Sequence, residues 1–113
     1  MVISAERIFF KVLHDCTKDD FTADPVALHK VFYDMYLLNP DKMQSFDFII
    51  RINPYSPKLE ELILYYQLCG ILARKNPELI RYEINKNRLN EIDSEDIDSL
   101  ELGKPESFST IFG

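Results

Sequence analysis

Residues 46–84, FDFIIRINPYSPKLEELILYYQLCGILARKNPELIRYEI, decide the fold because they predict a strand, a helix and a two-stranded hairpin in that order. In the segment 46–52 apolar residues alternate with others, which is the period of a strand. Ser56 suits the N-cap of a helix, and Pro57 suits its first position, where the missing N–H costs nothing. Gly70 suits the left-handed residue that ends such a helix.

The helix that begins after Ser56 has two chemically different faces. At about 100° per residue, one face collects four side chains suited to a core: Leu59, Leu62, Ile63 and Tyr66. The opposite face combines two acids with three large apolar residues: Glu60, Glu61, Leu64, Tyr65 and Leu68. Beyond the helix, two segments predict paired strands: Ile71 to Arg74, and Leu79 to Ile84 with Ile80, Tyr82 and Ile84 on one face.

Two further helices are predicted before this stretch. Ser4 can cap the first, whose apolar residues recur at helical spacing: Ala5, Ile8, Phe9, Val12, Leu13 and Cys16. The second begins at Asp24-Pro25, ends near Asn39-Pro40, and carries Leu28, Val31, Phe32, Met35 and Tyr36. The segment 17–22 between them is polar and acidic, and predicts a loop.

The C-terminal segment 89–113 is acidic and is predicted to be an extension of a domain formed by residues 1–88. Of the 19 acidic residues, seven lie here with a single lysine, so the net charge of −6 arises entirely in this segment. We expect a short helix over 95–100 and an extended arm over the last ten residues. Three interpretations stay open: a solvated end, a cover for the basic hairpin, or an arm whose apolar residues dock on a partner.

Length and composition bound the class of protein. The chain of 113 residues has room for one domain with a modest core, and 46% hydrophobic residues suffice for a globular fold. No apolar run reaches the roughly 18–20 residues of a membrane span, and the N-terminus does not read as a signal segment. Cys16 and Cys69 lie far apart without a partner motif, which is typical of reduced thiols in a cytoplasmic protein.

Enzyme chemistry is not indicated, and we expect no catalytic residue, cofactor or metal. His14, Asp15 and Cys16 are consecutive on a predicted helix, so their side chains point to different faces and cannot converge on one ligand. His29 reads as a structural or solvated histidine. With only three glycines, the chain has no phosphate-binding glycine loop. No small-molecule substrate is therefore expected.

The order helix, helix, strand, helix, hairpin over residues 4–86 resembles a winged-helix domain, a helix-turn-helix variant with a β-hairpin wing. The most specific part is Pro54-Tyr55-Ser56, followed by Leu59, Leu62, the turn 69–72 and the hairpin. It is similar to small prokaryotic winged-helix proteins, in which a Gly-Pro-Tyr-Ser segment opens the third helix. Here Asn53 replaces the glycine, and Asn also tolerates left-handed backbone. The resemblance implies an α+β fold of three helices and a small antiparallel sheet with a β-hairpin wing.

The first functional hypothesis is a non-catalytic interaction module that self-associates, as a homo-oligomer, or serves as an accessory subunit of a larger assembly. Its contacts would come from the outer face of the third helix and from the C-terminal segment: Glu61, Leu64, Tyr65, Leu68, Ile97, Leu100, Phe108 and Phe112. The alternative for Leu64 and Leu68 is packing within the chain, under the C-terminal segment or the first helix.

The second hypothesis is a DNA-binding transcriptional regulator or antitoxin-like protein that uses a basic wing. Duplex DNA would meet basic residues of the hairpin and its surroundings: Lys58, Arg74, Lys75, Arg81, Lys86 and Arg88. Two observations weigh against it. The reading helix would bring two carboxylates to the phosphates, and residues 1–88 carry no net charge. A solvated hairpin of mixed charge is the alternative use of these residues.

Overall fold

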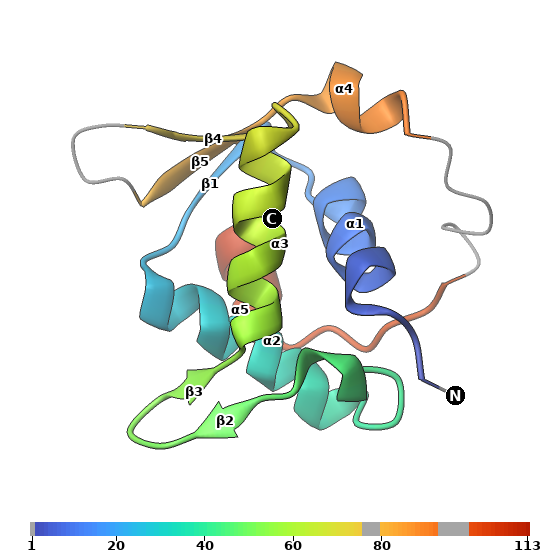
Figure 1. Ribbon diagram of the computed structural model, residues 1–113, viewed down its shortest axis with the longest axis vertical. Coiled ribbons are helices and arrows are strands. Elements are labelled where there is room, and N and C mark those ends of the chain that lie inside the picture. The colour runs from blue at the N-terminus through green and yellow to red at the C-terminus, as the bar shows by residue number, and fades with distance from the viewer. Residues whose placement is uncertain (1, 76–79, 93–99) are drawn as a thin grey trace.

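The computed structural model describes residues 2–75, 80–92 and 100–113. Within these ranges the protein is α+β, with five α-helices, one 3₁₀ helix and five short strands (Figure 1). In chain order they are α1 (Ala5–Asp15), β1 (Asp20–Thr22), α2 (Pro25–Leu38), η1 (Gln44–Phe46), β2 (Ile49–Ile50), β3 (Pro54–Tyr55), α3 (Pro57–Leu68), β4 (Leu72–Lys75), β5 (Arg81–Ile84), α4 (Lys86–Asn90) and α5 (Glu106–Phe112).

The three helices predicted from the sequence form where their capping residues place them. The side chains of Ser4, Asp24 and Ser56 each accept a hydrogen bond from a backbone N–H three residues later. Such a bond satisfies one of the donors that the first turn of a helix leaves unpaired. At the other end of α3, Gly70 has a φ of +78°, as the left-handed position after a helix requires. The limits of α3 are therefore local consequences of the sequence.

A three-stranded antiparallel sheet with the order β1-β5-β4 covers one end of the helices. β4 and β5 pair as the predicted hairpin, with Leu72 opposite Ile84. The prediction of a loop over 17–22 is wrong in part, because β1 pairs with β5 and places Phe21 beside Tyr82. The two rings stack with 5.0 Å between their centroids. This pairing explains how three residues of a polar, acidic segment become a strand.

The predicted strand over 46–52 is wrong in part, because only Ile49–Ile50 of this segment forms a strand. Phe46 ends the 3₁₀ helix η1, Asp47 turns the backbone with a φ of +50°, and only β2 and β3 form a short hairpin. Phe46 is buried, but Ile52 at the hairpin tip is 96% exposed. Asn53 does not have a positive φ, so it does not replace a glycine by a left-handed turn. The alternation of apolar residues therefore does not mark one buried face.

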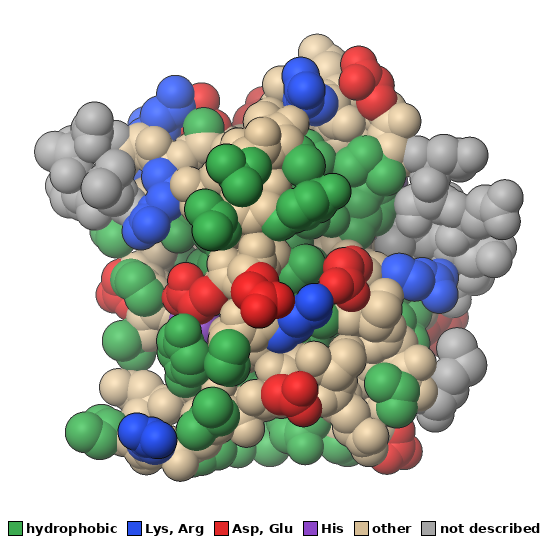
Figure 2. All heavy atoms as spheres, in the orientation of Figure 1, with side chains coloured by type: hydrophobic (Ala, Val, Ile, Leu, Met, Phe, Trp, Pro, Cys, Tyr) green, Lys and Arg blue, Asp and Glu red, His purple; other side chains and the backbone are tan. Residues whose placement is uncertain are grey.

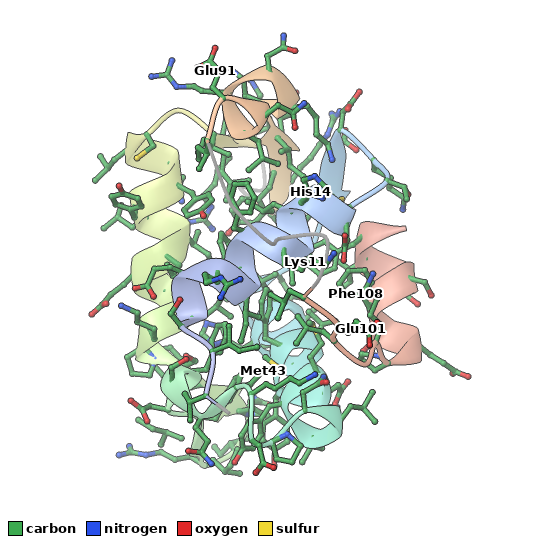
Figure 3. All side chains as sticks on the ribbon, turned by 90° about the vertical axis from the view of Figure 1, so that its right-hand side faces the viewer. Lys11, His14, Met43, Glu91, Glu101 and Phe108 are labelled. Atoms are coloured by element: carbon green, nitrogen blue, oxygen red, sulfur yellow. The ribbon has the colours of Figure 1, made fainter. Side chains whose placement is uncertain are left out.

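The C-terminal residues 100–113 belong to the core of the domain. The expected extended arm is instead helix α5, which packs against α2 and β1 (Figure 3). Phe108 and Phe112 are only 2% and 1% exposed, and Leu100 and Leu89 are also buried. Residues on both sides of position 88 therefore contribute to one hydrophobic core. The helix expected over 95–100 lies, except for Leu100, outside the described residues.

Polar contacts also hold the C-terminal segment in place. The amide side chain of Asn39 donates to the carbonyl of Gly103 at 2.9 Å and accepts from its N–H at 2.8 Å. The Lys104 ammonium lies 2.9 Å from the Asp15 carboxylate, which also pairs with Lys11 at 3.2 Å. Burial raises the pKa of Asp15, but the hydrogen bonds from Lys104 and Lys11 outweigh it, so the pKa lies below its usual value.

Phe112→Ala is expected to lower the free energy of unfolding by about 3–5 kcal/mol, because a buried ring is replaced by a cavity. Urea unfolding followed by circular dichroism measures this. Thr110→Ala, at an exposed position of the same helix, is the control and should change stability by about 0.5 kcal/mol or less. An equally small effect of Phe112→Ala would mean that α5 does not contribute to the core.

Acid should weaken the docking of the C-terminal segment through Asp15. Because its pKa is lowered in the folded protein, its contribution is present above about pH 4 and is lost as the pH falls through the folded pKa. The contribution should be about 1 kcal/mol or less, since both lysines reach solvent. We expect Asp15→Asn to lower stability at neutral pH and to reduce its loss in acid. The exposed Asp41→Asn is the control, and an identical acid dependence in both variants would contradict the assignment.

Candidate protein-interaction surface

The outward side of α3 exposes three large apolar side chains to solvent. Leu64, Tyr65 and Leu68 are 58%, 60% and 78% exposed, whereas the four residues predicted for the core side of the helix are buried. Together with the exposed Glu61 they are called the α3 surface here. The alternative in which Leu64 and Leu68 pack within the chain is wrong, because the described part of the chain leaves both side chains mostly uncovered.

Figure 2 shows this surface from the front, with hydrophobic side chains gathered over the upper half of α3. Below them runs a band of acidic and basic side chains. Lys58 lies 2.8 Å from the Glu6 carboxylate of α1 and 3.7 Å from that of Glu61. The hydrogen bond from Lys58 lowers the pKa of Glu6, so this acid is ionised at neutral pH. The lower border of the apolar area is therefore acidic.

Arg88 places a positive charge at the upper border of the apolar area, at the C-terminal end of α3. Arg88 of α4 is exposed, and its Nε donates to the Cys69 carbonyl at 2.7 Å. The same side chain lies over Gly70, where an added Cβ would meet its Nε at 3.4 Å. A guanidinium at a helix C-terminus also interacts favourably with the helix dipole. Arg88 is thereby fixed at the end of the apolar area.

The N-terminal end of α3 is held by a buried histidine. His29 Nδ1 accepts from the Ser56 backbone N–H at 3.0 Å, so Nε2 carries the hydrogen and donates to Glu60 at 2.8 Å. The ring also stacks on Tyr55 with 4.8 Å between centroids. Both nitrogens are thus occupied by structural bonds, which agrees with the structural interpretation of this histidine.

A second exposed apolar area, missed from the sequence, lies on the β2–β3 hairpin. It consists of Ile49, Ile50, Ile52 and Tyr55, next to Val26 of α2. A hollow of about 180 Å³ between the hairpin and α2 is lined in part by Val26, Tyr55 and Glu60. The available signal was the alternation of apolar residues over 46–52, which predicts a strand but does not predict that its isoleucines are exposed.

The C-terminal residues of the predicted interface are not available as contacts. Leu100, Phe108 and Phe112 are buried in the chain's own core, because α5 folds onto α2 and β1. Ile97 lies outside the described residues. Of the predicted protein contacts, the structure therefore brings together only the four of the α3 surface.

The residues predicted to bind DNA lie at three separate places. Arg74, Lys75 and Arg81 are on the hairpin, Lys86 and Arg88 are on α4, and Lys58 is at the opposite end of α3. Most bind groups of the chain itself: Arg81 pairs with Asp20 and Lys75 with Glu83, while Lys86 donates to the carbonyls of Leu13 and Cys16. The Arg74 guanidinium lies 5.4 Å from the centre of the Tyr82 ring.

The consecutive residues His14, Asp15 and Cys16 also make contacts within the chain rather than forming a site. Asp15 lies 3.9 Å from His14 Nδ1 but pairs more closely with two lysines, and the buried Cys16 thiol donates to the Phe112 carbonyl at 3.2 Å. Within residues 2–75, 80–92 and 100–113 no three metal-ligating side chains come together. No helix in these ranges is long and apolar enough to cross a bilayer.

No protein-family model matches the chain, and neither a curated protein nor a solved structure resembles it closely enough to count as a match. The geometry and charge of the surfaces themselves therefore carry the functional argument. By that measure the α3 surface stands out, because its apolar side chains lie on one rigid helix between an acidic and a basic border.

The position of the basic residues leads to a prediction for duplex DNA. Because the outward side of α3 carries acids and the hairpin cations lie beside Asp20 and Glu83, we expect no strongly salt-dependent binding. Fluorescence anisotropy with random duplex DNA at about 50 mM salt tests this. Affinity that falls steeply between about 50 and 200 mM salt would contradict it and support a basic wing.

Proposed function

We propose that the chain is a non-catalytic interaction module of winged-helix type that binds a protein partner through the α3 surface. The order of elements supports the winged-helix part of the proposal. Helices α1, α2 and α3 precede the hairpin of β4 and β5, and β1 joins the hairpin as a third strand. The position of α3 supports the functional part, since Figure 1 shows it at the front of the molecule, with the other helices behind it or beside it.

The observation that carries the proposal is the exposure of Leu64, Tyr65 and Leu68 on one side of α3. Fully burying a large apolar side chain contributes about 1.5–3 kcal/mol. Three such side chains together contribute about 4.5–9 kcal/mol, which covers part of an association cost of about 4–15 kcal/mol. Contacts around the border of the patch would supply the remainder. Covering this surface with a complementary one is therefore favourable, because it removes three apolar side chains from water.

The charges next to the patch favour a protein over a nucleic acid. Glu61 has 72% of its side chain exposed and lies one helical turn from Leu64 and Tyr65. A phosphate backbone placed on this side of α3 would meet that carboxylate and the Glu60 carboxylate, and within the described ranges Lys58, which lies 3.7 Å from Glu61, offsets them in part. Arg88 at the opposite end offers a protein partner a place for an acid. A protein surface with charges of both signs fits both ends.

The helix is rigid enough to present this surface without rearrangement. Its inner side packs in the core through Leu59, Leu62 and Tyr66, and Tyr66 meets Phe9 of α1 with ring centroids 4.9 Å apart. Little conformational entropy is lost on binding when the binding residues already sit on such an element. The C-terminal residues support the proposal only indirectly, by completing the core behind α3.

Photocrosslinking in the cells that naturally produce the protein tests the proposal. A photoreactive amino acid at Leu68 should give a protein product of defined mass. Adding Leu64→Glu should remove that product, because a central apolar contact is worth about 2 kcal/mol or more, or about 30-fold in affinity. Circular dichroism should show an unchanged fold.

Leu37 of α2 provides a matched control, because it is 58% exposed, as Leu64 is. Leu37→Glu should leave the crosslinked product in place. The proposal fails if position 68 gives no protein product, or if Leu64→Glu leaves the product unchanged.

A further inference from the structure

We propose that the partner is a second copy of this chain, with the two α3 helices antiparallel about a twofold axis that passes near Leu64 and Tyr65. This inference rests on the proposed function and names the partner of the same surface. A twofold interface requires a surface that is complementary to itself: whatever lies on one side of the axis must fit what lies on the other. The charged groups around the α3 surface give it this property.

The charge complementarity follows from the two borders of the patch. Glu60 and Glu61 lie on its N-terminal side, and Arg88 lies on its C-terminal side, bound to the Cys69 carbonyl. Figure 2 shows a band of mainly acidic side chains below the hydrophobic area, and both basic and acidic side chains above it. A half-turn about an axis through the hydrophobic area therefore brings the acids of one copy to the basic end of the other.

The helix geometry gives the register. With an axis between Leu64 and Tyr65, Glu61 of one copy faces position 68 of the other, and Glu60 faces position 69. At about 1.5 Å per residue these positions lie about 5–7 Å from the axis. Arg88 is anchored at the carbonyl of position 69, so its guanidinium lies at the level of the opposing acids. The apolar side chains meet at the centre, where water is excluded most completely.

Other arrangements of two copies are less favourable. In a parallel pair Glu61 would face Glu61, and like charges close together destabilise an interface. A head-to-tail contact would leave one apolar surface of each pair uncovered and would continue into a filament. Only the antiparallel pair covers both patches and pairs opposite charges at both ends.

The shape of the molecule permits the close approach that such packing needs. Figure 1 shows α3 at the front of the molecule, and the perpendicular view in Figure 3 places it along one outer edge. Two helices pack with their axes about 8–10 Å apart, so neighbouring elements must not stand in front of the helix. The apolar centre is small, and the dimer is therefore weak and concentration-dependent.

Charge reversal followed by analytical ultracentrifugation tests the antiparallel pair. Glu61→Arg and Arg88→Glu should each raise the dissociation constant of the dimer about tenfold or more, and combining them should restore it to within about threefold. Leu64→Glu should abolish the dimer, and Leu37→Glu should not change it. A double variant that is weaker than both single variants, or a native protein that stays monomeric at millimolar concentration, would overturn the proposal.

A disulfide experiment tests the orientation without altering Arg88, so that its hydrogen bond to the Cys69 carbonyl is kept. In a Cys69→Ser background, chains with Glu61→Cys are mixed with chains with Leu68→Cys and oxidised. An antiparallel pair predicts a crosslink in the mixture and none with Glu61→Cys alone. A crosslink formed by Glu61→Cys alone would overturn the antiparallel arrangement.

The two levels of the proposal fail differently. A photocrosslink from position 68 to a different protein, in a chain that is monomeric in the ultracentrifuge, removes the second copy as partner and leaves the interaction surface standing. The absence of any product from position 68, together with a monomeric chain, removes both.

Discussion

The seating of α3 is the constraint on which the rest of the structure depends. Ser56 is fully buried and has three roles at once: its hydroxyl caps the Leu59 N–H, donates to the Phe46 carbonyl at 2.5 Å, and its own N–H binds His29. These bonds fix where the helix begins and how it is rotated. The rotation decides which residues enter the core and which are left outside. The exposed apolar patch is thus a consequence of a buried polar network.

The parts of the fold that were predictable from the sequence are those decided by nearby residues. A cap such as Asp24 and a left-handed glycine such as Gly70 act within one helical turn. The strand β1 was not predictable in this way, because Asp20–Thr22 becomes a strand only by pairing with residues about sixty positions later. The helix α5 had a local signal, since Phe108 and Phe112 are four residues apart, but the acidic charge of the segment dominated its interpretation.

The candidate site was predictable in its composition but not in its exposure. The sequence showed that Leu64 and Leu68 share a side of α3, yet the C-terminal segment could have covered them. The structure places the C-terminal helix against α2 and β1 instead, where the rings of Phe112 and Phe21 meet with centroids 5.0 Å apart. The basic residues of the hairpin were misleading because Arg81 has a partner that is distant in the sequence. The acid that pairs with it is Asp20 of β1.

Affinity and orientation have separate physical origins at the α3 surface. Apolar burial has no direction, so Leu64, Tyr65 and Leu68 alone would tolerate several ways of pairing two helices. The charges at the borders contribute little net free energy in water, but they penalise every arrangement that brings like charges together. A patch that is acidic at one end and basic at the other therefore has one preferred partner geometry. That preference is built into a helix whose position was already fixed by Ser56, so folding itself determines how the surface can be used.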